Sequence, residues 1–268
     1  MKYRLLLLIP IGFCALVVGG TFATAPETRG IVFFRPEVMT VKLLAVCGTL
    51  LGAASFQRGD RLRWAWAGNA GCYLLLFGMD LFFPPPVRQG PAGLSPVYTG
   101  LHTIMATTAN ASAVVGMVIF GRVYRTADLT LPGSPLTRRV WTAVAVAVAS
   151  LILVPALIAD VAQIGLGDYH GMAGLASDLG DFICFCVVVP ILLTALALRG
   201  GLLVWPWALL TACQLGWLLY DVAGATHFFD RTTARVLEEL FRTLACTSAM
   251  AAGIAQAWAV RGASDAPR

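Results

Sequence analysis

Charged side chains are scarce in this chain. They make up 12% of its 268 residues, whereas 58% are hydrophobic and the mean hydropathy is +0.78. A soluble domain carries about 25% charged residues, so a surface with half that share cannot be wetted on all sides and most of the molecule must face lipid. The net charge is +5, but the basic residues form no dense stripe, so we expect no binding to nucleic acid.

Several residue types needed for familiar membrane chemistry are also few. The chain has only two lysines, and none follows Lys42, which excludes a retinal protein with its Schiff base in a late span. Three histidines, His102, His170 and His227, are a poor fit to paired haem ligands, and no HxxxH or HExxH spacing occurs. His170 and His227 could still lie at the same outer opening of the bundle, either as metal ligands or as solvated loop residues. Seven cysteines fall in apolar segments and form no CxxC, so we expect buried thiols, no metal and no cofactor.

Long apolar segments are what the chain has in abundance. About 20 apolar residues are needed to cross a bilayer as a helix, and open sheet is excluded from lipid because its backbone groups would be unpaired. The predicted spans are residues 5–24, 38–57, 64–83, 99–121, 140–160, 178–198, 203–223 and 238–260. The first ends in Ala23-Thr24-Ala25, which has the form of a signal-peptide cleavage site, but Pro26 would follow the cut, so we expect the segment to be retained as a helix.

A repeat orders these spans. Residues 37–80 and 178–221 match at 12 of 44 places without a gap. The most specific matches are Arg58/Arg199, Trp64/Trp205, Trp66/Trp207, Cys72/Cys213 and Asp80/Asp221. Each copy holds four spans, so both copies have the same orientation and are related by an axis along the membrane normal. The prediction is an all-α polytopic membrane bundle of eight transmembrane helices in two parallel four-helix repeats, residues 1–139 and 140–268.

The basic residues predict the orientation of the bundle. Twelve lysines and arginines fall on the side of the two termini, five on the other side and two within spans. Cytoplasmic loops carry the excess of positive charge, so we expect both termini in the cytoplasm of a bacterium and the protein in its cytoplasmic membrane. The four repeat tryptophans would be anchors at the cytoplasmic interface. Small residues at Ala109, Ala113 and Gly116, and at Ala245, Ala249 and Gly253, would allow close helix packing.

Ionisable groups gather at the opposite, outer end of the predicted spans, where such groups usually face a cavity or a partner. Five acids would lie in first helical turns, where capping and solvation explain them: Glu37, Asp178, Asp181, Glu238 and Glu239. Glu238 would pair with Arg242. Lys42 would either snorkel to the interface or pair with an acid. Three further acids would either be solvated or face a cavity: Asp80, Asp160 and Asp221. Of these, Asp80 and Asp221 could face each other across the repeat axis.

These residues suggest binding more than catalysis. The candidate ligand-binding residues are Asp80, Asp221, Lys42, His102, Asp160, Asp181 and Arg242. We expect a sensor or a membrane-complex subunit with a polar pocket open to the extracytoplasmic side. The alternatives are a secondary transporter of a small solute or ion, and an intramembrane enzyme acting on a lipid or lipid-linked substrate. The expected partners are membrane lipid, a small-molecule or ion ligand and a second protein in the membrane.

Overall fold

The computed structural model describes residues 2–83, 96–126, 135–165, 170–197, 201–225 and 229–264, and every regular element within these ranges is a helix. The long helices match the eight predicted segments in order. They are α2 (Leu8–Ala23), α4 (Arg35–Ala54), α5 (Arg61–Phe82), α6 (Pro96–Thr126), α7 (Pro135–Gly165), α8 (His170–Ala197), α9 (Val204–Ala225) and α10 (Arg231–Ser264). Short turns complete the N-terminal part: α1 (Lys2–Leu5), α3 (Pro26–Arg29) and the π-helical η1 (Gly30–Phe34).

Within the described residues, six helical segments are long and apolar enough to cross a membrane, as expected of an integral membrane protein. They are Tyr3–Ala23, Pro26–Ala54, Gly100–Thr126, Arg139–Gly165, Gly171–Leu196 and Arg231–Gly262. The outer helices expose large apolar side chains, such as Phe22 in α2, which is 85% exposed, and Leu151 in α7, which is 79% exposed. Water would penalise such a surface, whereas lipid does not.

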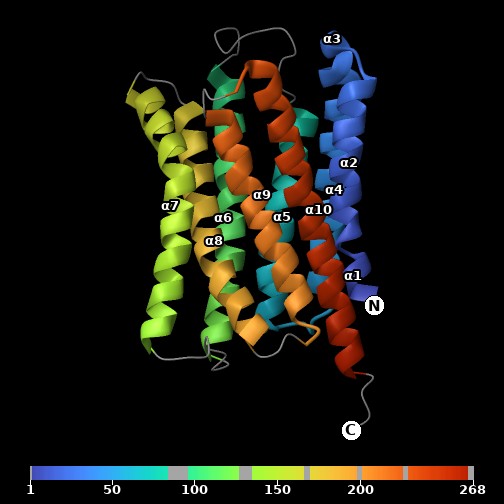
Figure 1. Cartoon of the computed structure of the whole chain (residues 1–268), viewed down its shortest axis with the longest axis vertical. Helices are drawn as coiled ribbons and strands as arrows, with labels where there is room; N and C mark the ends of the chain where they lie inside the picture. The colour runs from blue at the N-terminus through green and yellow to red at the C-terminus, as the bar shows by residue number, and fades with distance from the viewer. Residues whose placement is uncertain are drawn as a thin grey trace.

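Helices α5 and α9 are not among those six segments. Each carries a buried polar side chain in its middle, Asn69 in α5 and Gln214 in α9, and an aspartate near its end, Asp80 or Asp221. In the view of Figure 1 both lie near the middle of the bundle's width. Helix α5 packs against α4 and α6, and α9 packs against α7, α8 and α10. Helix α5 still exposes apolar side chains, such as Leu74 (57% exposed) and Phe82 (71% exposed), and its polar Asn69 is shielded because it is buried against neighbouring helices.

The long helices run along the long axis of the molecule, and the start of α1 lies at the same end of the bundle as the end of α10 (Figure 1). Besides the contacts of α5 and α9, α4 packs against α10 and α6 packs against α8. Helix α2 lies against α10, and α7 lies against α8. The order of contacts brings elements far apart in the chain, such as α4 and α10, into one core.

Small residues set the closest helix contacts, as the sequence predicts. A Cβ atom added to Gly253 of α10 would lie 1.9 Å from the carbonyl oxygen of Gly48 in α4. One added to Gly116 of α6 would lie 2.6 Å from the carbonyl oxygen of Ala65 in α5. Ala109 is fully buried on the same face of α6 as Gly116. The backbones therefore touch directly, which is the contact that holds helices together in lipid.

The half of the bundle nearest the termini is filled by apolar and aromatic side chains. Trp66 and Trp207 are buried, and both contact Phe120 edge-to-face, with ring centroids 5.4 and 5.1 Å away. The prediction that all four repeat tryptophans anchor the interface is therefore wrong for Trp66 and Trp207, while Trp64 is exposed. Residues two positions apart lie about 200° apart around a helix, so Trp64 and Trp66 cannot face the same surroundings.

Candidate functional site

A cavity of about 300 Å³ lies in the other half of the bundle, between the start of α4, the end of α5 and the first half of α10. Helices α4, α5, α6, α8, α9 and α10 all contribute to its wall, and α5 contributes the most, followed by α6. Its lining residues are Lys42, Asn69, Cys72, Tyr73, Leu76, Met79, Asp80, His102, Ala106, Asn110, Ala113, Ala173, Ser177, Asp181, Gln214, Trp217, Tyr220, Arg235 and Arg242. Five of the seven predicted site residues are among them.

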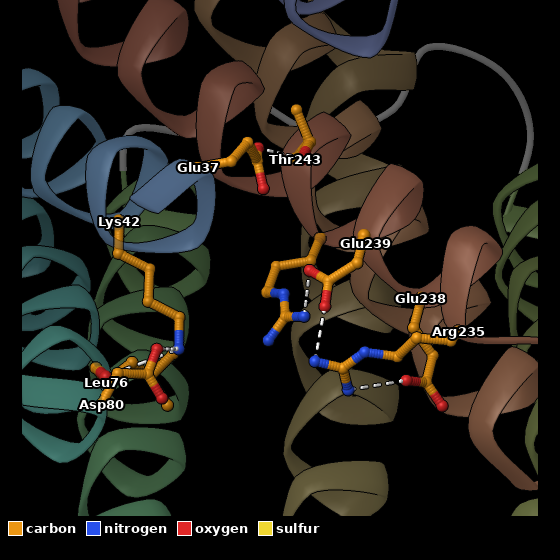
Figure 2. A network of polar contacts seen from close by, with 9 residues as sticks. Glu37, Lys42, Leu76, Asp80, Arg235, Glu238, Glu239 and Thr243 are labelled. Carbon is orange, nitrogen blue, oxygen red and sulfur yellow. Dashed lines mark hydrogen bonds and ion pairs between the residues drawn. The ribbon is translucent and has the colours of Figure 1, made fainter. Parts of the chain in front are cut away.

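Lys42 and Asp80 form an ion pair on one side of the cavity (Figure 2). The ammonium Nζ of Lys42 donates a hydrogen bond of 2.5 Å to Asp80 Oδ2 and a longer one of 3.5 Å to the carbonyl oxygen of Leu76. The Lys42 side chain is 3% exposed and that of Asp80 is 18% exposed. Lys42 therefore does not snorkel to the interface. Of the two interpretations that the sequence left open, pairing with an acid is the correct one.

Helix α10 carries a second charged network (Figure 2). Arg235 contacts Glu238 at 3.3 Å and Glu239 at 2.7 Å, and Arg242 donates to the other oxygen of Glu239. Arg242 also lies over the ring of Tyr220, 5.3 Å from its centroid. The predicted pair Glu238–Arg242 is wrong. Arg235, Glu239 and Arg242 are spaced by four and three residues and lie on one face of α10, so Arg242 meets Glu239 instead of Glu238.

The acids expected at helix starts are mostly buried instead. Asp178, Asp181 and Glu239 are all buried, and half-buried Glu37 accepts a 2.5 Å hydrogen bond from Thr243 Oγ1, which joins α4 to α10. The surface interpretation fails because the helices begin earlier than the apolar runs do. Helix α8 starts at His170 and α10 at Arg231, so the three buried acids lie about two to three turns inside their helices. Glu37, by contrast, does lie in the first turn of α4, as predicted.

Asp160, Asp178, Asp181 and Asp221 form a cluster of acids from α7, α8 and α9. The carboxyl group of Asp221 is within hydrogen-bonding reach of Asp178 and of Asp181, and Asp160 is within reach of Asp178. Two carboxyl groups can hydrogen-bond to each other only if one of them keeps a proton. Asp80 and Asp221 therefore have different partners, and the facing pair suggested by the repeat does not form.

Aromatic and neutral polar side chains complete the wall. Trp217 donates through Nε1 to the hydroxyl of Tyr73 at 3.3 Å, and that hydroxyl lies 3.0 Å from Cys213 Sγ. The ring of His102 stacks on Tyr98 with centroids 6.3 Å apart. The proposed meeting of His170 and His227 concerns side chains outside the described part of the chain. Across the described ranges, no group of three or more His, Cys, Asp or Glu side chains has the arrangement needed to hold a metal ion.

Several cavity residues were missed at the level of sequence. Tyr73 and Gln214 both line the cavity, and they occupy the same register of the repeat, 141 positions apart. A comparison that counts only identical residues does not score a tyrosine against a glutamine, so these two positions gave no signal. A search for polar or aromatic residues at equivalent positions in both copies would have found them.

No family model matches the chain, and neither a curated protein nor a solved structure matches it. Fold and site together define a class: an all-helical protein with membrane-compatible helices and a buried polar cavity in one half of its bundle.

Proposed function

We propose that the protein is an integral membrane ligand-binding bundle, acting as a sensor or as a subunit of a membrane complex. The observation that carries this proposal is the polar cavity of about 300 Å³ inside an apolar bundle. Buried polar groups are costly in such surroundings unless something binds them. One of them, the Oε1 atom of the buried Gln214, has no hydrogen-bond partner among the residues that the structure describes. A small polar ligand would supply what this wall lacks.

The proposed architecture is eight transmembrane helices in two parallel repeats, residues 1–139 and 140–268. The helix contacts support it. Within one copy α4 packs on α5 and α5 on α6, and in the other α8 packs on α9 and α9 on α10. Between the copies, the α4–α10 contact has its counterpart in the α6–α8 contact. The first helix of each copy departs from this symmetry, since α2 packs on α10 whereas α7 packs on α8 and α9.

We further propose that both termini are cytoplasmic, in a bacterial cytoplasmic membrane, and that the cavity therefore faces the extracytoplasmic side. The excess of lysine and arginine at the end of the bundle that holds the termini supports this orientation.

Two alternatives are weaker. Transport would require a polar route past the cavity, but the half of the bundle nearest the termini holds the apolar cluster around Trp66, Phe120 and Trp207. Catalysis is favoured by one observation, the close approach of Asp181 and Asp221 beside a cavity that His102 also lines. An intramembrane enzyme acting on a lipid or lipid-linked substrate is thus the second candidate, distinguished by turnover of a bound lipid.

The test is a thermal-stability screen of the purified protein in detergent against polar small molecules of different charge. A ligand that binds only the folded state raises its stability in proportion to the logarithm of ligand concentration. The cavity is then blocked with Ala173→Phe, and Ala147→Phe on the exposed face of α7 is the matched control. We expect stabilisation of the wild type and of Ala147→Phe but not of Ala173→Phe. Equal stabilisation of all three proteins, or of none, would contradict the proposal.

A further inference from the structure

We infer that the cavity takes a small organic ammonium ion, whose N–H groups are bound by Asp181 and Gln214. This inference rests on the proposed ligand-binding function and names the chemical class of the ligand. It follows from comparing the charges on the two sides of the cavity.

On the side formed by α4, α5 and α10, every basic group in the wall already has a carboxylate. Lys42 is paired with Asp80. Arg235 and Arg242 share Glu239, and Arg235 also contacts Glu238. This side therefore offers little net charge to a ligand, and an anion would have to compete with carboxylates that are already in place.

On the side formed by α8 and α9, the acids have no such compensation. Asp181 lines the cavity and is 7% exposed, and behind it lie Asp178 and Asp221. Among the residues that the structure describes, no lysine or arginine forms an ion pair with any of these three acids. Carboxyl groups within hydrogen-bonding reach of one another must share protons. An entering ammonium ion can replace one such proton, which leaves to water, and the charge of the cluster is then balanced by the ligand.

A second observation also points to a hydrogen-bond donor. Gln214 lines the cavity one turn before Trp217 and is 4% exposed. Its side-chain carbonyl oxygen Oε1 accepts no hydrogen bond from any residue that the structure describes. A buried acceptor without a donor is unfavourable, and an ammonium N–H is the donor that would satisfy both Gln214 and Asp181. The indole of Trp217 and the ring of Tyr73 supply flat aromatic walls, against which a cation is also favoured.

The side formed by α4, α5 and α10 holds one donor that an acceptor at the other end of the ligand would satisfy. In the described part of the chain, the buried Nε of Arg242 has no hydrogen-bond partner. The ligand class is therefore an ammonium compound that tolerates a hydroxyl or carboxylate at its far end, rather than a simple anion.

Four probes of equal chain length test this selectivity on the wild-type protein: n-butylamine, 4-aminobutyrate, butyrate and n-butanol. Binding is measured by isothermal titration calorimetry in detergent. We expect both amines to bind and the anion and the alcohol to bind at least tenfold more weakly. Butyrate binding as tightly as n-butylamine would overturn the inference.

Two variants then locate the ammonium group. Asp181→Asn and Gln214→Leu should each weaken n-butylamine binding by about tenfold or more, and Glu27→Gln, which removes an exposed acid from α3, should leave it unchanged. Unaltered binding in both cavity variants would also overturn the inference. If none of the four probes binds but the broader screen yields a ligand that Ala173→Phe abolishes, the ammonium assignment fails and the proposed function stands. If nothing binds in either experiment, both fail.

Discussion

The ion pair between Lys42 and Asp80 allows a sharp prediction of stability. At 2.5 Å, and with an effective dielectric constant of about 20, the attraction between two unit charges is roughly 7 kcal/mol before desolvation is subtracted. Much of that is offset by the cost of burying the charges, and removing one partner of a buried pair typically destabilises by about 3–5 kcal/mol.

The two single variants should differ. Asp80→Asn leaves an ammonium group that is 3% exposed, so we expect a loss near the upper end, about 4–5 kcal/mol. Lys42→Met leaves a carboxylate that is 18% exposed and can recover some water, so we expect about 3 kcal/mol. The double variant removes both charges, and its loss should be about 1–2 kcal/mol, well below the sum of the two single losses.

Reversible unfolding in mixed micelles, titrated with a denaturing detergent, measures these differences. Arg35→Met is the control, because Arg35 is exposed at the start of the same helix, and its effect should stay within about 0.5 kcal/mol. A double variant that loses as much as the two single variants together would refute the reasoning. So would two single variants as stable as the control.

Two further predictions concern packing and the acid cluster. Gly253→Val should destabilise the bundle by about 3 kcal/mol, the upper end of overpacking costs, because the new side chain would clash with the backbone of Gly48. The control Gly12→Val places its side chain where nothing lies within 4 Å and should not destabilise the bundle by overpacking. The same unfolding titration measures both variants. The stability of Asp221→Asn should stay within about 1 kcal/mol of the wild type, because its amide can donate to Asp178 and Asp181. Asp221→Leu cannot donate and should lose about 1–3 kcal/mol. Equal losses of the two variants in the same titration would contradict shared protons in the cluster.

The helices could be predicted from the sequence because the signal for them is long and repeated. Each apolar run has a helix over it, and the small residues at Gly253 and Gly116 do make close contacts. The errors arose where a helix continues beyond its apolar run. Helix α8 starts eight residues before Asp178, and an acid that seemed to cap the helix is therefore buried. Hydropathy shows which part of a helix can lie in lipid, but it does not show where a helix ends when that end is buried in protein.

The partners of the charged residues could not be predicted in the same way. The sequence match draws attention to Asp80 and Asp221, but it cannot show that one stretch supplies a lysine and the other supplies acids. Lys42 is equivalent to Ile183, and Asp181 is equivalent to Thr40. Because these substitutions break the symmetry, Asp80 meets a cation while Asp221 meets Asp178 and Asp181. Partner choice depends on such differences between the copies, and sequence matching discards them.

The two helices that are least suited to lipid contribute nine of the nineteen residues of the cavity wall, six from α5 and three from α9. They cover matching stretches of the sequence, and neither is among the described segments apolar enough to span a membrane. They contribute Asn69, Tyr73, Asp80, Gln214 and Trp217 to the cavity. A helix must stay apolar on the side that faces lipid, so its polar residues can lie only on the side that faces other helices. Helices α4, α8 and α10 contribute Lys42, Asp181 and Arg242 to the cavity and are still apolar enough to span a membrane. Low hydropathy in a helix of this bundle is therefore one sign of the site, and here it marks α5 and α9.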